Sequence, residues 1–280
     1  MKPGQTKRKS SSFGAWALAV IVVAVAIAAG VVLWRQSLQG GAPAQAPAPA
    51  GTTGAPASPG SAPIRLPISE AAPAAASTAP LPALAGSDSE VAESLLRLGG
   101  AKLADLLLRD QVIARIVATV DALPRPAVAT RLLPLRTPQG MFVPDSAGAE
   151  PALGPRIAQR YAPYLSVVDQ LDAKAAVAWY VHYYPLFQQA YVELGYPHGY
   201  FNDRLIAAID NLLAVPAGTG HEALLKSGPY YLFADPSLQS LSAGQKLLLR
   251  MGPEQAARVK AKLREIRSAL VSQGNPGTGA

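Results

Sequence analysis

The stretch DQVIARIVATVDALP, residues 110–124, carries the clearest helical signal in the chain. Its apolar residues recur at the i, i+3, i+4 and i+7 spacing that brings side chains to one face of an α-helix. They are Ile113, Ile116, Val117 and Val120. Asp110 can cap the first turn, and Pro124 ends the helix because proline has no amide hydrogen to donate. The stretch therefore predicts a helix with a buried face.

Helical patterns continue toward the amino terminus. Ser87-Asp88-Ser89-Glu90 has the form of a capping box, in which the serine and glutamate side chains bind backbone amides at a helix start. Gly99-Gly100 interrupts the helix that follows, and a shorter helix resumes with Leu103.

Toward the carboxyl terminus, Asp172, Asn202 and Ser242 stand where each can cap a further helix. Pro185 predicts a kink or a new helix, and Gly252-Pro253 a helix end. The last helix has an apolar stripe at heptad spacing. Its members are Val259, Leu263, Ile266 and Leu270.

No alternating strand pattern of useful length accompanies these helices. Residues 124–155 contain seven prolines and predict a connection or flap over the helices, with one short extended piece at 141–143. The fold class is therefore all-α: we expect a multi-helix globular domain over residues 88–272, followed by a disordered tail over 273–280.

Residues 15–34 are twenty consecutive positions without a charge, enough for a helix of about 30 Å that spans a bilayer. Trp16 and Trp34 stand at the two ends, where indole rings favour the headgroup layer. The sequence thus predicts a single transmembrane helix that contacts the lipid bilayer.

Four basic residues precede this span, within a tail at 1–14, and only Arg35 follows it directly. The more positively charged flank of a membrane span stays in the cytoplasm. The amino terminus is therefore expected in the cytoplasm, and the globular domain in the periplasm, of a bacterial inner-membrane protein. A cleaved signal peptide is the alternative, but its apolar region is normally only about 7 to 15 residues long.

Residues 35–87 are rich in alanine and proline and contain few charges. Such a segment cannot bury enough apolar surface to fold, so we expect a disordered, semi-rigid linker between membrane and domain.

The net charge of +7 comes mostly from residues 1–35, which hold five basic and no acidic side chains. The predicted globular domain is nearly balanced, so we expect no nucleic-acid partner despite the sequence pI of about 9.7. The chain has no cysteine, which excludes disulfides and thiol chemistry. None of the three histidines has the spacing of a helical metal site, and we expect neither metal nor cofactor.

An ordered string of motifs runs through the predicted domain. It comprises residues 115–126, which end in VDALPRP (120–126), and then YPLFQ (184–188), AYVELGYP (190–197), FNDRL (201–205), AID (208–210), FADP (233–236), GQK (244–246) and LRMGP (249–253). These motifs resemble those of an uncharacterised proteobacterial family, the domain of unknown function numbered three thousand and fourteen. The resemblance covers most of residues 90–270 and implies an anchored envelope protein without an assigned activity. Ala122 departs from the family's pattern, which has asparagine there.

Charged residues lie among the apolar ones of these motifs. Glu193 and Asp210 are the candidate acid or base groups, and Lys246 and Arg250 are candidate binding groups beside them. Structural ion pairs between helices are the other interpretation, because a buried charge needs a partner.

All ten tyrosines lie between Tyr161 and Tyr231. Aromatic residues at helical spacing are usually core, but consecutive tyrosines cannot all face one core. Tyr184 and Tyr196 are therefore candidates to line a cleft for a peptide or a glycan.

Two classes of function remain open on these patterns. A noncatalytic interaction module that binds an envelope protein or a cell-wall component is favoured, because no nucleophile or metal motif occurs. An anchored hydrolase that uses carboxylates is the alternative, as is a glycan-binding module.

Overall fold

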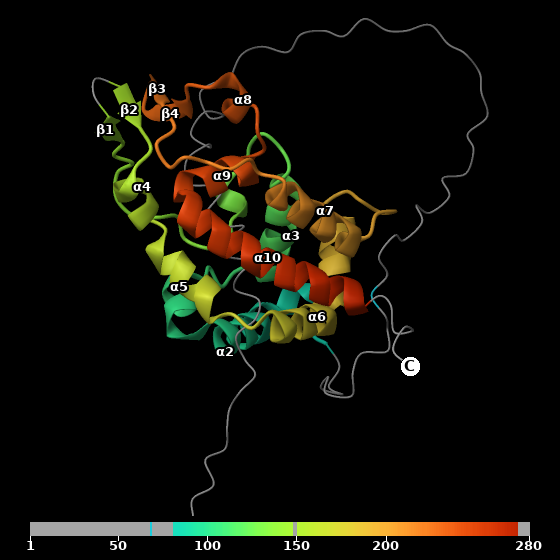
Figure 1. The fold of residues 1–280 in the computed structure, drawn as a ribbon. Coiled ribbons are helices and arrows are strands. Elements are labelled where there is room, and N and C mark those ends of the chain that lie inside the picture. The colour runs from blue at the N-terminus through green and yellow to red at the C-terminus, as the bar shows by residue number, and fades with distance from the viewer. Residues whose placement is uncertain (1–67, 69–80, 148–149, 274–280) are drawn as a thin grey trace, which may run out of the picture.

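The computed structural model describes residue 68, residues 81–147 and residues 150–273. Most of these residues are helical, as predicted, and two short hairpins accompany the helices (Figure 1). In chain order the elements are η2 (Leu84–Gly86), α2 (Asp88–Leu106), α3 (Val112–Ala122), η3 (Thr130–Leu132), β1 (Asp145–Ala147), β2 (Glu150–Ala152), α4 (Pro155–Gln159), α5 (Ala162–Gln170), α6 (Ala173–Glu193), α7 (Phe201–Leu213), β3 (Leu224–Ser227), β4 (Tyr230–Phe233), α8 (Pro236–Gln239), α9 (Ala243–Met251) and α10 (Pro253–Gln273).

The predicted tail at 1–14, span at 15–34 and terminal segment at 274–280 lie outside the described residues, as does most of the linker at 35–87. Within the linker's last residues, Leu81 and Leu84 pack against the hydrophobic core. Over the residues that are described, no helix has the length and apolar character needed to cross a membrane.

Helix α3 lies inside the bundle and contacts α2, α6 and α7 (Figure 1). The four apolar residues of its predicted stripe are each 1% exposed, which confirms that face. The opposite side is also covered, because Thr119 and Asp121 are buried too. Polar groups on the buried sides of such a helix must be satisfied within the protein.

The amino terminus of α3 is capped by another helix. The Asp88 carboxylate accepts the amides of Gln111 at 2.7 Å and Val112 at 2.8 Å, whereas Asp110 pairs with Arg115. The predicted cap at Asp110 is therefore wrong. Gln111 has a positive φ of 54°, and this turn directs the free amides toward α2.

The predicted capping box at Ser87 is wrong as well. Ser87 stands at the N-cap but has helical backbone angles, and its hydroxyl donates to the Leu84 carbonyl at 2.9 Å. Gly99-Gly100 does interrupt the helix as predicted, because α2 is kinked at Gly100, where φ is 66°.

Two of the three predicted caps further along are confirmed. Asp172 accepts the Ala175 amide at 2.8 Å, and Ser242 forms a complete capping box with Gln245. Asn202 is not a cap: it lies inside the first turn of α7, buried, and accepts a hydrogen bond from the Tyr180 hydroxyl at 3.3 Å.

Helix α6 continues through Pro185, where a kink or a new helix was expected. Pro185 is exposed, so the carbonyl that loses its amide partner lies toward water. The buried side of α6 carries the aromatic core, in which Phe187 stacks on Phe201 of α7 with ring centroids 5.5 Å apart.

The two hairpins lie together at one end of the helical bundle, next to α8 (Figure 1). Strands β1 and β2 pair antiparallel, as do β3 and β4, and Leu153 donates to the Glu222 carbonyl at 2.9 Å to join the hairpins. These strands are absent from the sequence prediction, and residues 141–143, expected to be extended, precede β1 without belonging to a strand.

Of the predicted connection or flap at 124–155, residues 124–144 contact α2 and α3, whereas the following residues form the hairpin β1–β2 and the start of α4. Leu108 donates to the Pro134 carbonyl and Arg136 to the Leu106 carbonyl, both at 2.8 Å. Helix α10 crosses the other side of the bundle and packs on α5, α6, α7 and α9 (Figure 1). Its predicted heptad stripe is buried, which confirms that helix.

Candidate functional site

The two candidate carboxylates lie on the surface and apart from the candidate cations. Glu193 is exposed at the end of α6 and accepts a hydrogen bond from Gln189 at 3.0 Å. Asp210 pairs with Arg267 of α10 at 2.5 Å, and the two side chains are 48% and 40% exposed. The structure thus does not bring either carboxylate to Lys246 or Arg250.

Lys246 and Arg250 are buried on α9, each only 4% exposed. Their partners are backbone carbonyls: the Lys246 ammonium donates to Gln239 at 3.1 Å, and the Arg250 guanidinium donates to Tyr231 at 3.1 Å. The alternative of structural ion pairs between helices therefore holds for Asp210, which pairs with Arg267, but not for Lys246 or Arg250.

The two candidate tyrosines serve packing and polar networks. Tyr184 is half-buried and donates to Gln188 at 3.1 Å, and burial raises the pKa of its hydroxyl to about 12. Tyr196 stacks on Tyr191 with ring centroids 4.5 Å apart. Neither tyrosine lines the groove described below.

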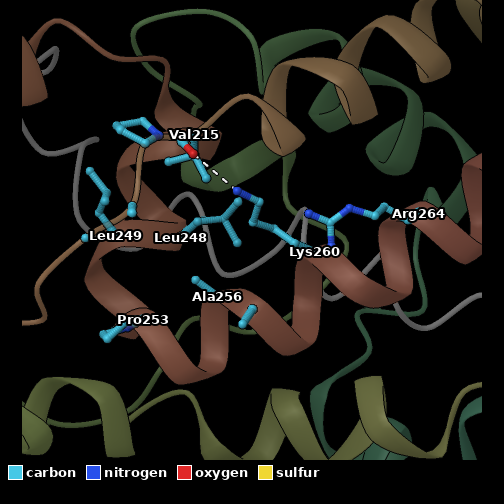
Figure 2. A pocket seen from close by; sticks show the side chains of 12 residues that line it. Val215, Leu248, Leu249, Pro253, Ala256, Lys260 and Arg264 are labelled. Atoms are coloured by element: carbon cyan, nitrogen blue, oxygen red, sulfur yellow. Dashed lines mark hydrogen bonds between the residues drawn. The ribbon is translucent and has the colours of Figure 1, made fainter.

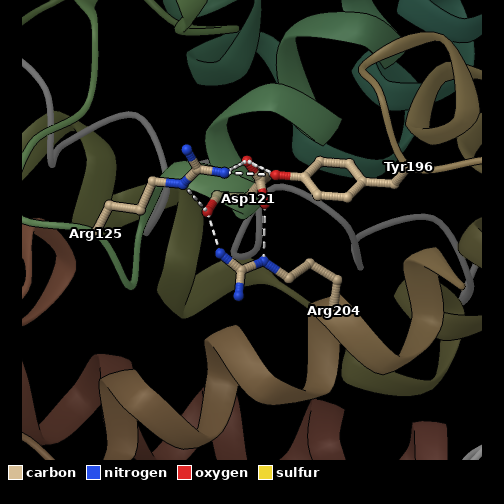
Figure 3. Close-up of polar contacts among 4 residues, drawn as sticks. All are labelled: Asp121, Arg125, Tyr196 and Arg204. Carbon is tan, nitrogen blue, oxygen red and sulfur yellow. Dashed lines mark hydrogen bonds and ion pairs between the residues drawn. The ribbon is translucent and has the colours of Figure 1, made fainter. Parts of the chain in front are cut away.

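A buried carboxylate, Asp121 of α3, organises a polar network that the sequence reasoning missed (Figure 3). Arg204 of α7 donates its Nε to Asp121 at 3.0 Å, and a second nitrogen donates to the Asp121 backbone carbonyl. Arg125 pairs with the other carboxylate oxygen and donates to the Tyr196 hydroxyl at 2.6 Å. That hydroxyl lies 3.3 Å from the same Asp121 oxygen, to which it donates.

This network connects α3, α7 and the loop after α6. The Asp121 side chain is 8% exposed, so its charge requires the two arginines. All four residues fall in the ordered motifs, VDALPRP, AYVELGYP and FNDRL. Motif membership was the one available signal, but the motifs do not reveal which members meet in space.

A groove lies between the loop after α7, the end of α9 and the first half of α10 (Figure 2). Its volume is about 240 Å³. The lining is mostly aliphatic. It comprises Val215, Pro216, Ala217, Gly218, Leu248, Leu249, Gly252, Pro253, Ala256, Ala257, Lys260 and Arg264.

Both charged residues of the groove are cations from successive turns of α10. Lys260 donates to the Val215 carbonyl at 3.2 Å, and Arg264 extends from the next turn toward Lys260 (Figure 2). The Arg264 side chain is exposed and forms no hydrogen bond or ion pair within the part of the chain that the structure describes. A shallow depression of about 550 Å³ begins at Arg264 and continues along α10 to Ser272.

Glycines allow the groove walls to approach each other. A Cβ on Gly218 would lie 2.8 Å from the Glu222 carboxylate and 3.0 Å from a Leu249 methyl. Gly252, between α9 and α10, has a φ of 85°, which residues with a side chain rarely adopt. The groove shape therefore depends on these two positions.

Across the described ranges, no group of three or more histidine, aspartate and glutamate side chains is arranged to hold a metal ion. The groove presents apolar atoms and two cations. Such an arrangement can bind an apolar side chain next to an anionic group.

Comparisons with curated proteins and with solved structures find no match. A family model does match, over residues 112–267, which is more than half of the chain and includes the Asp121 network and the groove. The chain therefore belongs to the family described as protein of unknown function (DUF3014).

Proposed function

We propose that this protein is a membrane-anchored, noncatalytic binding module of the bacterial cell envelope. Its helical domain binds an extended peptide segment that places an apolar side chain in the groove and a carboxylate against Lys260 and Arg264. The observation that carries the proposal is the groove itself, an aliphatic hollow with two cations on one side.

The groove is small enough for one peptide side chain to fill it. Small-molecule sites usually occupy about 300–1,000 Å³, whereas this groove has about 240 Å³. One aliphatic or aromatic side chain can fill that volume against Leu248, Leu249 and Ala256. The depression that continues along α10 from Arg264 extends the surface available to the next residues of a peptide.

Charge complementarity selects an acidic segment. Lys260 and Arg264 are four residues apart on one helix, so their side chains reach the same side of the groove. Arg264 has no acidic partner among the described residues, whereas the neighbouring Arg267 and Lys262 pair with Asp210 and Glu265. A carboxylate from a ligand satisfies the guanidinium with charge-assisted hydrogen bonds.

The membrane anchor is part of the proposal and rests on the sequence. The uncharged run at 15–34, its terminal tryptophans and its basic amino-terminal flank support an inner-membrane helix with the amino terminus in the cytoplasm. The alanine- and proline-rich residues 35–87 then hold the domain away from the bilayer, in the periplasm, where it meets an envelope protein or a cell-wall peptide.

Calorimetric titration of the detergent-solubilised full-length chain tests the binding. The ligands are acetylated tetrapeptides that contain one leucine or phenylalanine next to a glutamate, each compared with its glutamine counterpart. We expect the glutamate form to bind roughly two- to fivefold more tightly, as one partly exposed ion pair contributes at most about 1 kcal/mol. Arg264→Glu should reverse this preference, and the control Arg109→Glu, an exposed arginine outside the groove, should preserve it. Equal affinities for both forms would refute the acidic ligand.

A further inference from the structure

Helix α9 buries two cations on the side away from the groove. Lys246 and Arg250 are four residues apart, so they project from the same face of the helix, and each is 4% exposed. No carboxylate in the described ranges forms an ion pair with either of them. Buried charges without an opposite charge are rare, because removing them from water is costly.

The cover over these cations consists of the β3–β4 hairpin and α8. Tyr231 and Gln239 supply one backbone carbonyl each, and the Arg250 guanidinium lies 5.1 Å from the centre of the Phe233 ring. The Nε of Arg250 is buried and makes no hydrogen bond. On one edge of the guanidinium, Nη2 therefore donates to the Tyr231 carbonyl, whereas Nε has no hydrogen-bond partner.

A third cation from another part of the chain approaches the same hairpin. Arg160, between α4 and α5, lies 5.8 Å from the ring centre of Phe142, which packs 5.6 Å from Tyr231. Its Nε is also buried without a hydrogen bond. Burial raises the pKa of the Tyr161 hydroxyl, and the positive charges of Arg160 and Arg250 lower it in part. The region around β4 therefore holds an excess of positive charge.

The carboxylates of the surrounding segment are engaged elsewhere. Asp235 caps α8 by accepting the Ser237 amide at 2.7 Å. Glu222 accepts the amides of Thr219 and Gly220 with one oxygen, and its other oxygen forms no hydrogen bond. Neither carboxylate neutralises α9. Burial lowers the pKa of Lys246 and Arg250, and the charge of Arg250 lowers that of Lys246 further.

We infer that the face of α9 formed by Lys246 and Arg250 is a binding site for an oxyanion, a phosphate or carboxylate group, beneath the β3–β4 hairpin. The anion takes the Nε and Nη2 edge of Arg250 in the bidentate geometry that guanidinium groups prefer, and one of its oxygens also accepts a hydrogen bond from the Lys246 ammonium. It replaces the Tyr231 and Gln239 carbonyls, which are neutral acceptors and weaker partners for a cation. The cover is a two-stranded hairpin and a four-residue helix, so few backbone bonds need to open.

This site is separate from the groove of the proposed function. Leu248, Leu249 and Gly252 face the groove, whereas Lys246 and Arg250 contact the hairpin side of α9. Each site can therefore be tested without the other.

Thermal unfolding of the full-length chain in detergent tests the inference, with inorganic phosphate or acetate as the probe and sodium chloride at equal ionic strength as the reference. We expect one of the two oxyanions to raise the melting temperature with a saturating dependence, and the one with the lower half-saturation concentration identifies the ligand class. Lys246→Met and Arg250→Met should abolish the saturable part. The matched controls are Lys102→Met and Arg109→Met, at exposed positions that precede the first sequence motif, and they should retain the saturable part.

A second measurement covers variants that fail to fold. Phosphorus NMR line broadening of inorganic phosphate measures binding to the unaltered chain, and Arg250→Lys, which keeps the charge but loses the fork, should weaken binding about tenfold or more. Oxyanion effects no larger than those of chloride would overturn the inference, and so would saturable binding that survives in both methionine variants. In either case Lys246 and Arg250 would serve only to hold the hairpin carbonyls.

Discussion

Replacing Asp121 by asparagine removes the one negative charge between Arg125 and Arg204 while preserving the side-chain shape. The Arg204 side chain is 25% exposed, and its charge-assisted bond to a buried carboxylate contributes about 1.5–3 kcal/mol. The Arg125 side chain is 50% exposed, so water screens its pair and its share is about 0–1 kcal/mol. We therefore expect Asp121→Asn to lower the free energy of unfolding by about 1.5–4 kcal/mol.

Urea denaturation followed by circular dichroism measures this change, and thermal unfolding should show a fall of roughly 3–16 °C for a domain of this size. Asp210→Asn is the matched control, because Asp210 also pairs with an arginine on another helix but is 48% exposed. Its cost should stay below about 1 kcal/mol. If the two substitutions cost the same, or if Asp121→Asn costs less than about 0.5 kcal/mol, burial does not decide the strength of these ion pairs.

Three further outcomes follow from the fold and the sequence. Gly218→Ala should destabilise the protein and weaken peptide binding together, because the new Cβ meets the Glu222 carboxylate at 2.8 Å; unchanged calorimetric affinity would contradict this. Tyr164 and Tyr184 have pKa values raised by burial to about 12, so the stability that they contribute is complete below pH 10, their ordinary pKa, and declines as pH rises toward 12. Ultraviolet titration checks this, and ionisation of both at pH 10 in the folded chain would refute it. A reporter that is active only outside the cytoplasm should be active when it is fused after Ser272, and the full-length chain should be found in the membrane fraction. A shortened soluble product would instead indicate a cleaved signal peptide.

Local patterns predicted those elements whose signals are complete within one segment. The stripe of α10 repeats over three turns and needs only one apolar partner surface, so periodicity located it. Asp172 and Ser242 cap their own helices because the residues that they bind lie three positions away. Ser87 and Asp110 also stand directly before a helix, but neither caps it. The amides of Gln111 and Val112 instead bind Asp88, which belongs to another helix.

The hairpin β3–β4 escaped prediction because its sequence does not alternate. Leu224 is buried and Leu225 is 57% exposed, so apolar residues occupy both faces of β3. The turn at Gly228, which has a φ of 58°, was the available signal.

The candidate polar residues show most clearly that a local pattern does not predict contacts between distant segments. Glu193 and Asp210 stood among apolar residues in the sequence, but the helix surface turns them toward water. Asp121, Tyr196 and Arg204 meet although 75 and 83 positions separate Asp121 from the other two. Distances between segments this far apart depend on the packing of the whole domain, which no single motif encodes.

Methyl NMR of the full-length chain in detergent, titrated with the leucine–glutamate tetrapeptide, tests the central claim of a peptide-binding groove most directly. The account predicts that shifts concentrate on the methyl groups of Val215, Leu248 and Leu249, and that Ala256→Trp, which fills the groove, abolishes them. Shifts confined to methyl groups outside the groove, or no shifts at millimolar peptide, would contradict it.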